Sequence, residues 1–109
     1  MPEVTADRRS VPRYAMVLAA DVVELPRGAR LAARTSDISR TGCYIDTLNP
    51  IPRGSQIRLR ITHHEEVFEA LGRVVYTSPG LGMGIVFETV APEQETMLQR
   101  WLEGPGQEY

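Results

Sequence analysis

The chain has 109 residues and a formal net charge of −2, and its hydrophobic and charged fractions are ordinary for a globular protein. This length suits one domain, and the slightly acidic charge excludes the overall basic field that drives non-specific binding to nucleic acid. The single cysteine, Cys43, excludes an internal disulfide, and no stretch approaches the ~20 apolar residues of a membrane span, so we expect a cytoplasmic protein without membrane insertion.

Short apolar segments separated by turn residues fill the middle of the chain, a pattern typical of an all-β barrel or sandwich. In the fourth segment Ile57, Leu59 and Ile61 alternate with polar residues, which predicts a strand with one buried face and one solvated face. The short connection 63–66 predicts a hairpin. The expected strands occupy residues 14–25, 31–38, 43–48, 57–62, 67–76 and 81–88.

One helix is expected from about Pro92 to Glu103. Proline suits the first helical position, and Glu93 and Glu95 in the first turn and Arg100 in the last turn suit the helix dipole. Four apolar residues share one face of this helix and can pack on the barrel or, alternatively, contact a partner: Met97, Leu98, Trp101 and Leu102.

Both ends of the chain are polar or rich in glycine and proline. We therefore expect flexible segments at residues 1–7 and 104–109. Between them, residues 8–103 form the one predicted domain.

The first polar motif is RRxxxR, formed by Arg8, Arg9 and Arg13. An arginine carries five donors in a rigid planar fork, so it can clamp a phosphate, address the O6 and N7 acceptors of guanine, or stack on a base. Pro12 disfavours helix at Val11, so these arginines are expected on an extended or turned segment that leads into the first strand.

The second motif, DxSxxG, begins at Asp37, at the end of the second predicted strand, and continues into a turn. An ionised aspartate accepts only, which matches the N1–H and N2–H donors of guanine, and the Ser39 hydroxyl can donate and accept. Residues two apart on a strand share a face, so Asp37 and Ser39 are expected to point to the same face while Ile38 points to the core. Gly42 is expected to supply a positive φ in the turn.

Each motif also has a purely structural interpretation. The arginines of the first motif could be solvated surface charges. Asp37 and Ser39 could be turn formers that bond their own backbone. Arg8 and Arg40 could contact phosphates or only add positive potential.

Other candidate chemistry is weaker. Residues 63–66 read His-His-Glu-Glu, but neighbouring strand residues point to opposite faces, so a solvated hairpin is preferred to a metal site. Cys43 is expected to be a small buried hydrophobe. No acid–base pair or nucleophile is evident, so we expect no enzyme and no cofactor. The aromatic residues do not cluster along the sequence, which argues against binding of single-stranded nucleic acid.

Because it carries both motifs in this order, the chain resembles the PilZ domain family from Arg8 to about Leu102. The segments 54–59, 72–75 and 82–87 are similar to later strands of that family. The resemblance implies a six-stranded antiparallel β-barrel with a C-terminal α-helix. It also implies a receptor for the bacterial second messenger cyclic diguanylate (cyclic di-GMP), without catalysis.

The resemblance also implies roles for individual residues. Arg9 and Arg13 match arginines that grip phosphates and guanine, and Arg8 matches an additional arginine beside them. Three residues match positions that surround one guanine: Asp37, Ser39 and Gly42. The ligand would order the N-terminal segment and so signal to an unidentified downstream protein partner in trans. The alternative is a PilZ-type adaptor that binds protein and not nucleotide.

Overall fold

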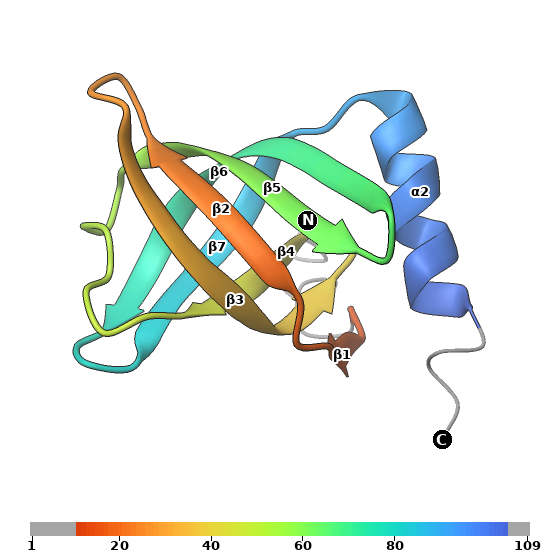
Figure 1. The fold of residues 1–109 in the computed structure, drawn as a ribbon, viewed down its shortest axis with the longest axis horizontal. Coiled ribbons are helices and arrows are strands. Elements are labelled where there is room, and N and C mark those ends of the chain that lie inside the picture. The colour runs from red at the N-terminus through yellow and green to blue at the C-terminus, as the bar shows by residue number, and fades with distance from the viewer. Residues whose placement is uncertain (1–10, 105–109) are drawn as a thin grey trace, which may run out of the picture.

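The computed structural model describes residues 11–104 of the protein. This part of the chain contains seven strands and one helix (Figure 1). In chain order they are β1 (Arg13–Ala15), β2 (Ala19–Glu24), β3 (Ala29–Ser39), β4 (Gly42–Asp46), β5 (Gln56–His63), β6 (Glu66–Ser78), β7 (Gly82–Thr89) and α2 (Pro92–Glu103). No helix among these residues combines the length and apolar character needed to cross a bilayer.

Six of the strands form a closed antiparallel barrel. Going round it, β2 pairs with β3, β3 with β4, β4 with β7, β7 with β6, β6 with β5, and β5 with β2 again. The predicted alternation in β5 is confirmed, because Ile57, Leu59 and Ile61 are fully buried while the residues between them are exposed. The predicted six-stranded barrel with a C-terminal helix is therefore confirmed.

The expected first strand, 14–25, is interrupted and forms two strands, β1 and β2. The cause is Thr35 on β3, whose side chain is fully buried. Its Oγ1 accepts from the Leu18 N–H at 3.0 Å and donates to the Met16 carbonyl at 2.6 Å. A hydroxyl that satisfies two backbone groups lets the chain leave the ladder between β1 and β2, and β1 then pairs separately with the end of β3.

Helix α2 lies beside the barrel next to the β5–β6 hairpin (Figure 1). Leu98, Trp101 and Leu102 are buried against the core, and Met97 packs at its edge. The predicted helix bounds and the predicted packing face are both confirmed. Burial of this stripe fixes α2 close to β1 and to the β3–β4 turn, where the second motif lies.

Candidate functional site

The pairing of β1 with β3 brings the two motifs together. Arg13 lies opposite Ser39, and Ala15 lies opposite Asp37. The Arg13 Nη2 donates to the Asp37 Oδ1 at 2.6 Å, across 24 residues of sequence. The two side chains keep 50% and 31% of their surface exposed. The structure therefore places a guanidinium group and a carboxylate side by side on the outside of the barrel.

Ser39 lies in the same turn, but its hydroxyl faces the backbone. The residue is 2% exposed, and its Oγ accepts from the N–H groups of Thr41 at 3.1 Å and Gly42 at 3.2 Å. These contacts are those of a serine turn. The Ser39 hydroxyl is thus buried in the turn and is not exposed beside the Asp37 carboxylate. The expectation that Ile38 points to the core is confirmed.

Gly42 is required for a different reason from the one expected. The positive-φ glycines of the described chain are Gly28, Gly54 and Gly80, so a positive φ does not explain Gly42. A Cβ at this position would lie 2.1 Å from the carbonyl oxygen of Ile85 on β7. The glycine therefore permits the close approach of β4 to β7, which closes the barrel next to the turn.

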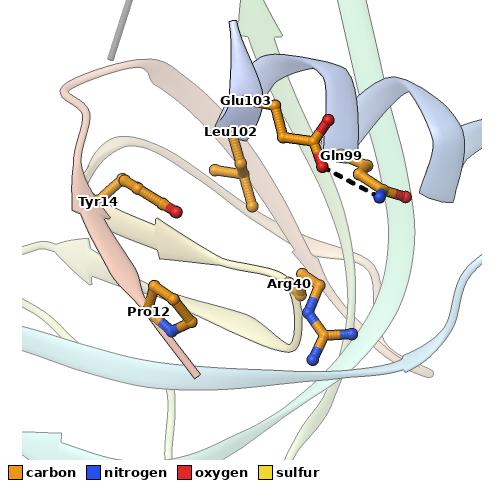
Figure 2. A pocket seen from close by; sticks show the side chains of 6 residues that line it. All are labelled: Pro12, Tyr14, Arg40, Gln99, Leu102 and Glu103. Atoms are coloured by element: carbon orange, nitrogen blue, oxygen red, sulfur yellow. Dashed lines mark hydrogen bonds between the residues drawn. The ribbon is translucent and has the colours of Figure 1, made fainter. Parts of the chain in front are cut away.

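Arg40, at the exposed tip of the turn, lines a surface pocket of about 350 Å³ between β1 and α2 (Figure 2). In Figure 2 one side of the pocket comes from the β1 segment and the other from α2. Within residues 11–104, Arg40 has no ion-pair partner. The other lining residues are Pro12, Tyr14, Gln99, Leu102 and Glu103.

We call Arg13, Asp37, Ser39, Arg40 and Gly42 the motif site. Two of the predicted site residues, Arg8 and Arg9, fall outside the described residues. So do the expected flexible ends, apart from Gly104. Tyr14 and Gln99 were not predicted as pocket residues, because nothing in the sequence indicates that the β1 segment and α2 face each other.

The His-His-Glu-Glu segment forms the predicted hairpin and holds the helix. Glu66 accepts from Arg100 at 3.0 and 3.3 Å and from the Trp101 Nε1–H at 2.8 Å. The ring of His63 packs edge-on against Trp101, with centroids 5.1 Å apart. We call His63, Glu66, Arg100 and Trp101 the helix anchor. The part of the chain described by the structure holds no group of three or more potential metal ligands.

The anchor and the core shift the pKa values of three groups. The hydrogen bond from Arg100, which has the larger effect, and the hydrogen bond from Trp101 hold the pKa of Glu66 below its ordinary value. Burial lowers the pKa of His63. Burial raises the pKa of the Cys43 thiol strongly, and that side chain is enclosed in the core as expected.

The PilZ domain family model matches residues 7–104, which include both motifs. The chain belongs to the PilZ domain family. A comparison with curated proteins found no match.

Solved structures of PilZ proteins share this fold at low sequence identity. The PilZ domain of YcgR from Escherichia coli, determined with cyclic di-GMP, is 18% identical with a TM-score of 0.71, covering 86% of this chain and 88% of that one. The PilZ domain of CeSA from a cellulose-synthesizing bacterium is 16% identical with a TM-score of 0.68, covering 83% and 93%. The Bacillus subtilis inhibitor of motility, MotI, is 19% identical with a TM-score of 0.69, covering 86% and 48%. The chain thus spans about half the length of MotI.

Proposed function

We propose that this PilZ domain is a receptor that binds cyclic di-GMP at the motif site. The observation that carries the proposal is the pairing of Arg13 with Asp37, which brings the two motifs together on an exposed surface. Membership of the family and the likeness to the YcgR domain determined with cyclic di-GMP support the choice of ligand.

The chemistry of the two side chains suits a ligand that carries both phosphates and guanines. The Arg13–Asp37 contact uses one guanidinium nitrogen and one carboxylate oxygen. The remaining arginine donors are available for a phosphate or for guanine O6 and N7, and the second carboxylate oxygen is available for the guanine N1–H and N2–H.

The other motif residues divide into supports and additional cations. Ser39 and Gly42 act as supports: the hydroxyl shapes the turn, and the glycine lets it lie against β7. Arg40 adds a positive charge on the α2 side of the turn. Arg8 and Arg9 are proposed to add further guanidinium groups to the site. This assignment rests on the RRxxxR motif alone.

The proposed output of binding is a change in the order of the N-terminal segment, residues 1–13, which alters the surface offered to a partner protein in trans. Arg13 lies on β1 and belongs to the motif site, so the chain that precedes it starts at that site, and this motivates the step. Hydrogen exchange at residues 4–13 tests it: protection should rise on addition of cyclic di-GMP. Identical exchange with and without the ligand would contradict it.

Calorimetric titration with cyclic di-GMP, with GTP and cyclic AMP as controls, tests the proposed function. Arg13→Ala and Asp37→Ala should abolish or strongly weaken binding. Arg34 and Asp46 form an ion pair of similar exposure between β3 and β4, at 3.7 Å, and serve as matched controls. Arg34→Ala and Asp46→Ala should leave the affinity unchanged. Absence of binding by the folded wild-type protein would reject the receptor and favour the protein-binding adaptor.

A further inference from the structure

The outer face of β3, β2, β5 and β6 carries a group of arginines away from the motif site. These strands are consecutive neighbours in the barrel, and β3, β2 and β5 lie side by side in Figure 1. Arg30 precedes Asp37 by seven residues on β3, which corresponds to about 20 Å along the strand, so this face is a separate surface. A surface pocket of about 350 Å³ lies on it, lined by Asp21, Val23, Arg30, Arg58, Arg60 and Glu69.

One row of side chains across this face is electrostatically satisfied. Asp21 on β2 is the direct partner of Arg60 on β5, and Arg60 is the direct partner of Glu69 on β6. The Arg60 guanidinium forms an ion pair with the Glu69 carboxylate at 2.9 Å. Arg60 thus stands between two carboxylates, so this row has no excess of positive charge.

The adjacent row carries two arginines without a carboxylate between them. Val23 on β2 is the direct partner of Arg30 on β3 and of Arg58 on β5, and Arg58 is the direct partner of Leu71 on β6. Both arginines are exposed, and within residues 11–104 neither forms an ion pair. Because neighbouring strands are about 4.8 Å apart, the two arginines are separated by about 10 Å, with an apolar side chain between them. We call Arg30, Val23, Arg58 and Leu71 the arginine row.

We propose that the arginine row is a docking surface for an acidic amphipathic helix of a partner protein. In an α-helix, residues i and i+7 share a face and lie about 10.5 Å apart along the axis. Glutamates at i and i+7 therefore match the separation of Arg30 and Arg58, and an apolar residue at i+3 or i+4 meets Val23. A second apolar residue at i+10 lies about 15 Å along the helix, which matches the position of Leu71 three strands from Arg30.

The carboxylates of the neighbouring row favour a protein helix over nucleic acid as the occupant. Nucleic acid presents a continuous line of phosphates, which Asp21 and Glu69 would repel. A helix presents its glutamates along one line only, so it contacts the arginines without placing negative charge over the second row. Docking through an amphipathic helix face is a recurring mode of recognition between proteins. The inference goes beyond the proposed function, because it assigns a surface to a partner and holds with or without bound cyclic di-GMP.

Two synthetic peptides test the surface, with binding to the full chain measured by fluorescence anisotropy and by NMR in the absence of cyclic di-GMP. The first peptide has roughly 20 residues, enough to form a helix in water, with glutamate at i and i+7 and leucine at i+3 and i+10. The second carries lysine in place of each glutamate. The glutamate peptide should bind and shift amide resonances on β3, β2, β5 and β6, while those of Arg13 and Asp37 stay unchanged. The lysine peptide should not bind.

Reversal of the charges in the arginine row gives the sharpest variants. Arg30→Glu and Arg58→Glu should each weaken binding of the glutamate peptide roughly tenfold, because an attractive contact becomes a repulsive one. The double variant should lose the glutamate peptide and gain the lysine peptide, a gain that loss of folding does not explain. Arg53→Glu is the matched control, because Arg53 is exposed before β5 and forms no ion pair in the part of the chain that the structure describes. It should stay within about twofold of wild type for the glutamate peptide and should not gain the lysine peptide.

Three results would overturn the docking surface. Equal binding of the two peptides, or an equal loss in Arg53→Glu, would show non-specific attraction in place of a defined site. Absence of glutamate-peptide binding by the folded wild-type protein would reject the helix, and it would leave the cyclic di-GMP titration of the motif site unaffected. Tighter binding of duplex DNA than of the glutamate peptide, with resonance shifts at the same row, would assign the row to nucleic acid.

Discussion

The motif site lies close to α2, and the helix anchor includes two residues of α2. Each contains an arginine–carboxylate pair, but the two carboxylates differ in how many hydrogen bonds they accept. In the helix anchor, Glu66 accepts from both Arg100 and Trp101, and both of its oxygens are engaged. In the motif site, the Arg13–Asp37 contact uses one nitrogen and one oxygen. A fully engaged carboxylate holds structure, whereas one with an exposed oxygen can accept from a ligand.

The energetics of exposed ion pairs support the same distinction between a pair that binds ligand and a pair that holds structure. A pair as exposed as Arg13–Asp37 contributes at most about 1 kcal/mol to stability. The helix anchor adds ring packing to its ion pair, because His63 lies against Trp101 and Trp101 lies near Phe68 in the core. We therefore expect substitutions in the two regions to separate: those in the motif site should change binding, and those in the helix anchor should change stability.

Substitution of Gly42 should have the largest effect and should change both binding and stability, because this residue belongs to the motif but also supports the barrel. In Gly42→Ala the new methyl group would meet the Ile85 carbonyl oxygen, which is backbone and cannot swing aside. We expect a loss of stability on the order of 3 kcal/mol, together with loss of ligand binding, as measured by denaturant unfolding and calorimetry. Gly84→Ala is the control, because the three atoms nearest to its new methyl group belong to the exposed ring of Tyr76, a side chain that can swing aside, and it should remain far more stable. Similar stabilities for these two variants would contradict this account of Gly42.

Arg13→Ala and Asp37→Ala should show the separation most clearly. Each removes charge-assisted hydrogen bonds to the ligand, so the affinity for cyclic di-GMP should fall roughly 10- to 100-fold. Stability should change by less than about 1 kcal/mol, because the ion pair is exposed. Calorimetry and thermal unfolding of the same samples measure both quantities. A large loss of stability in either variant would mean that the pair is structural, like the helix anchor.

Glu66→Gln should show the opposite behaviour. The amide keeps an acceptor for Trp101 but loses the charge that binds Arg100, so Tm should fall by a few degrees at neutral pH while ligand affinity is unchanged. A loss of affinity as large as that of Asp37→Ala would show that the two regions are coupled through α2.

The pH dependence of this difference in Tm follows from the lowered pKa of Glu66. Its folded-state pKa lies below the ordinary value of 4.5, so the folded protein binds fewer protons than the unfolded chain in the interval between them. The stabilisation by Glu66 is therefore complete above pH 4.5 and is lost as the pH falls through the folded-state pKa. The Tm values of wild type and Glu66→Gln should converge in acid. A difference that persists there would contradict a role for the Glu66 charge.

The sequence predicted those features that depend on local periodicity. The alternation of Ile57, Leu59 and Ile61 and the apolar face of the helix around Trp101 each require only the spacing of residues along one element. The spacing of the motifs also placed Arg13 and Asp37 in one candidate site, and the structure brings these two together.

The features that the sequence did not predict depend on contacts between elements. The break between β1 and β2 follows from hydrogen bonds of one buried hydroxyl, that of Thr35. The need for Gly42 follows from a carbonyl on another strand, and the alignment of Arg30 with Arg58 follows from the register of β3, β2 and β5. None of these leaves a periodic pattern in the chain.

Substitution of Arg40 should have the smallest effect on ligand affinity, and it tests how far the motif site extends towards α2. Its guanidinium lies at an exposed turn on the α2 side, beside the pocket formed with Tyr14 and Leu102. A single exposed cation contributes through screened attraction, so Arg40→Ala should weaken cyclic di-GMP binding only about two- to fivefold, and less at high salt. Arg40→Lys keeps the charge and should bind almost as wild type does. A loss as large as that of Arg13→Ala, not rescued by lysine, would instead assign Arg40 a directed contact with the ligand and extend the binding surface towards α2.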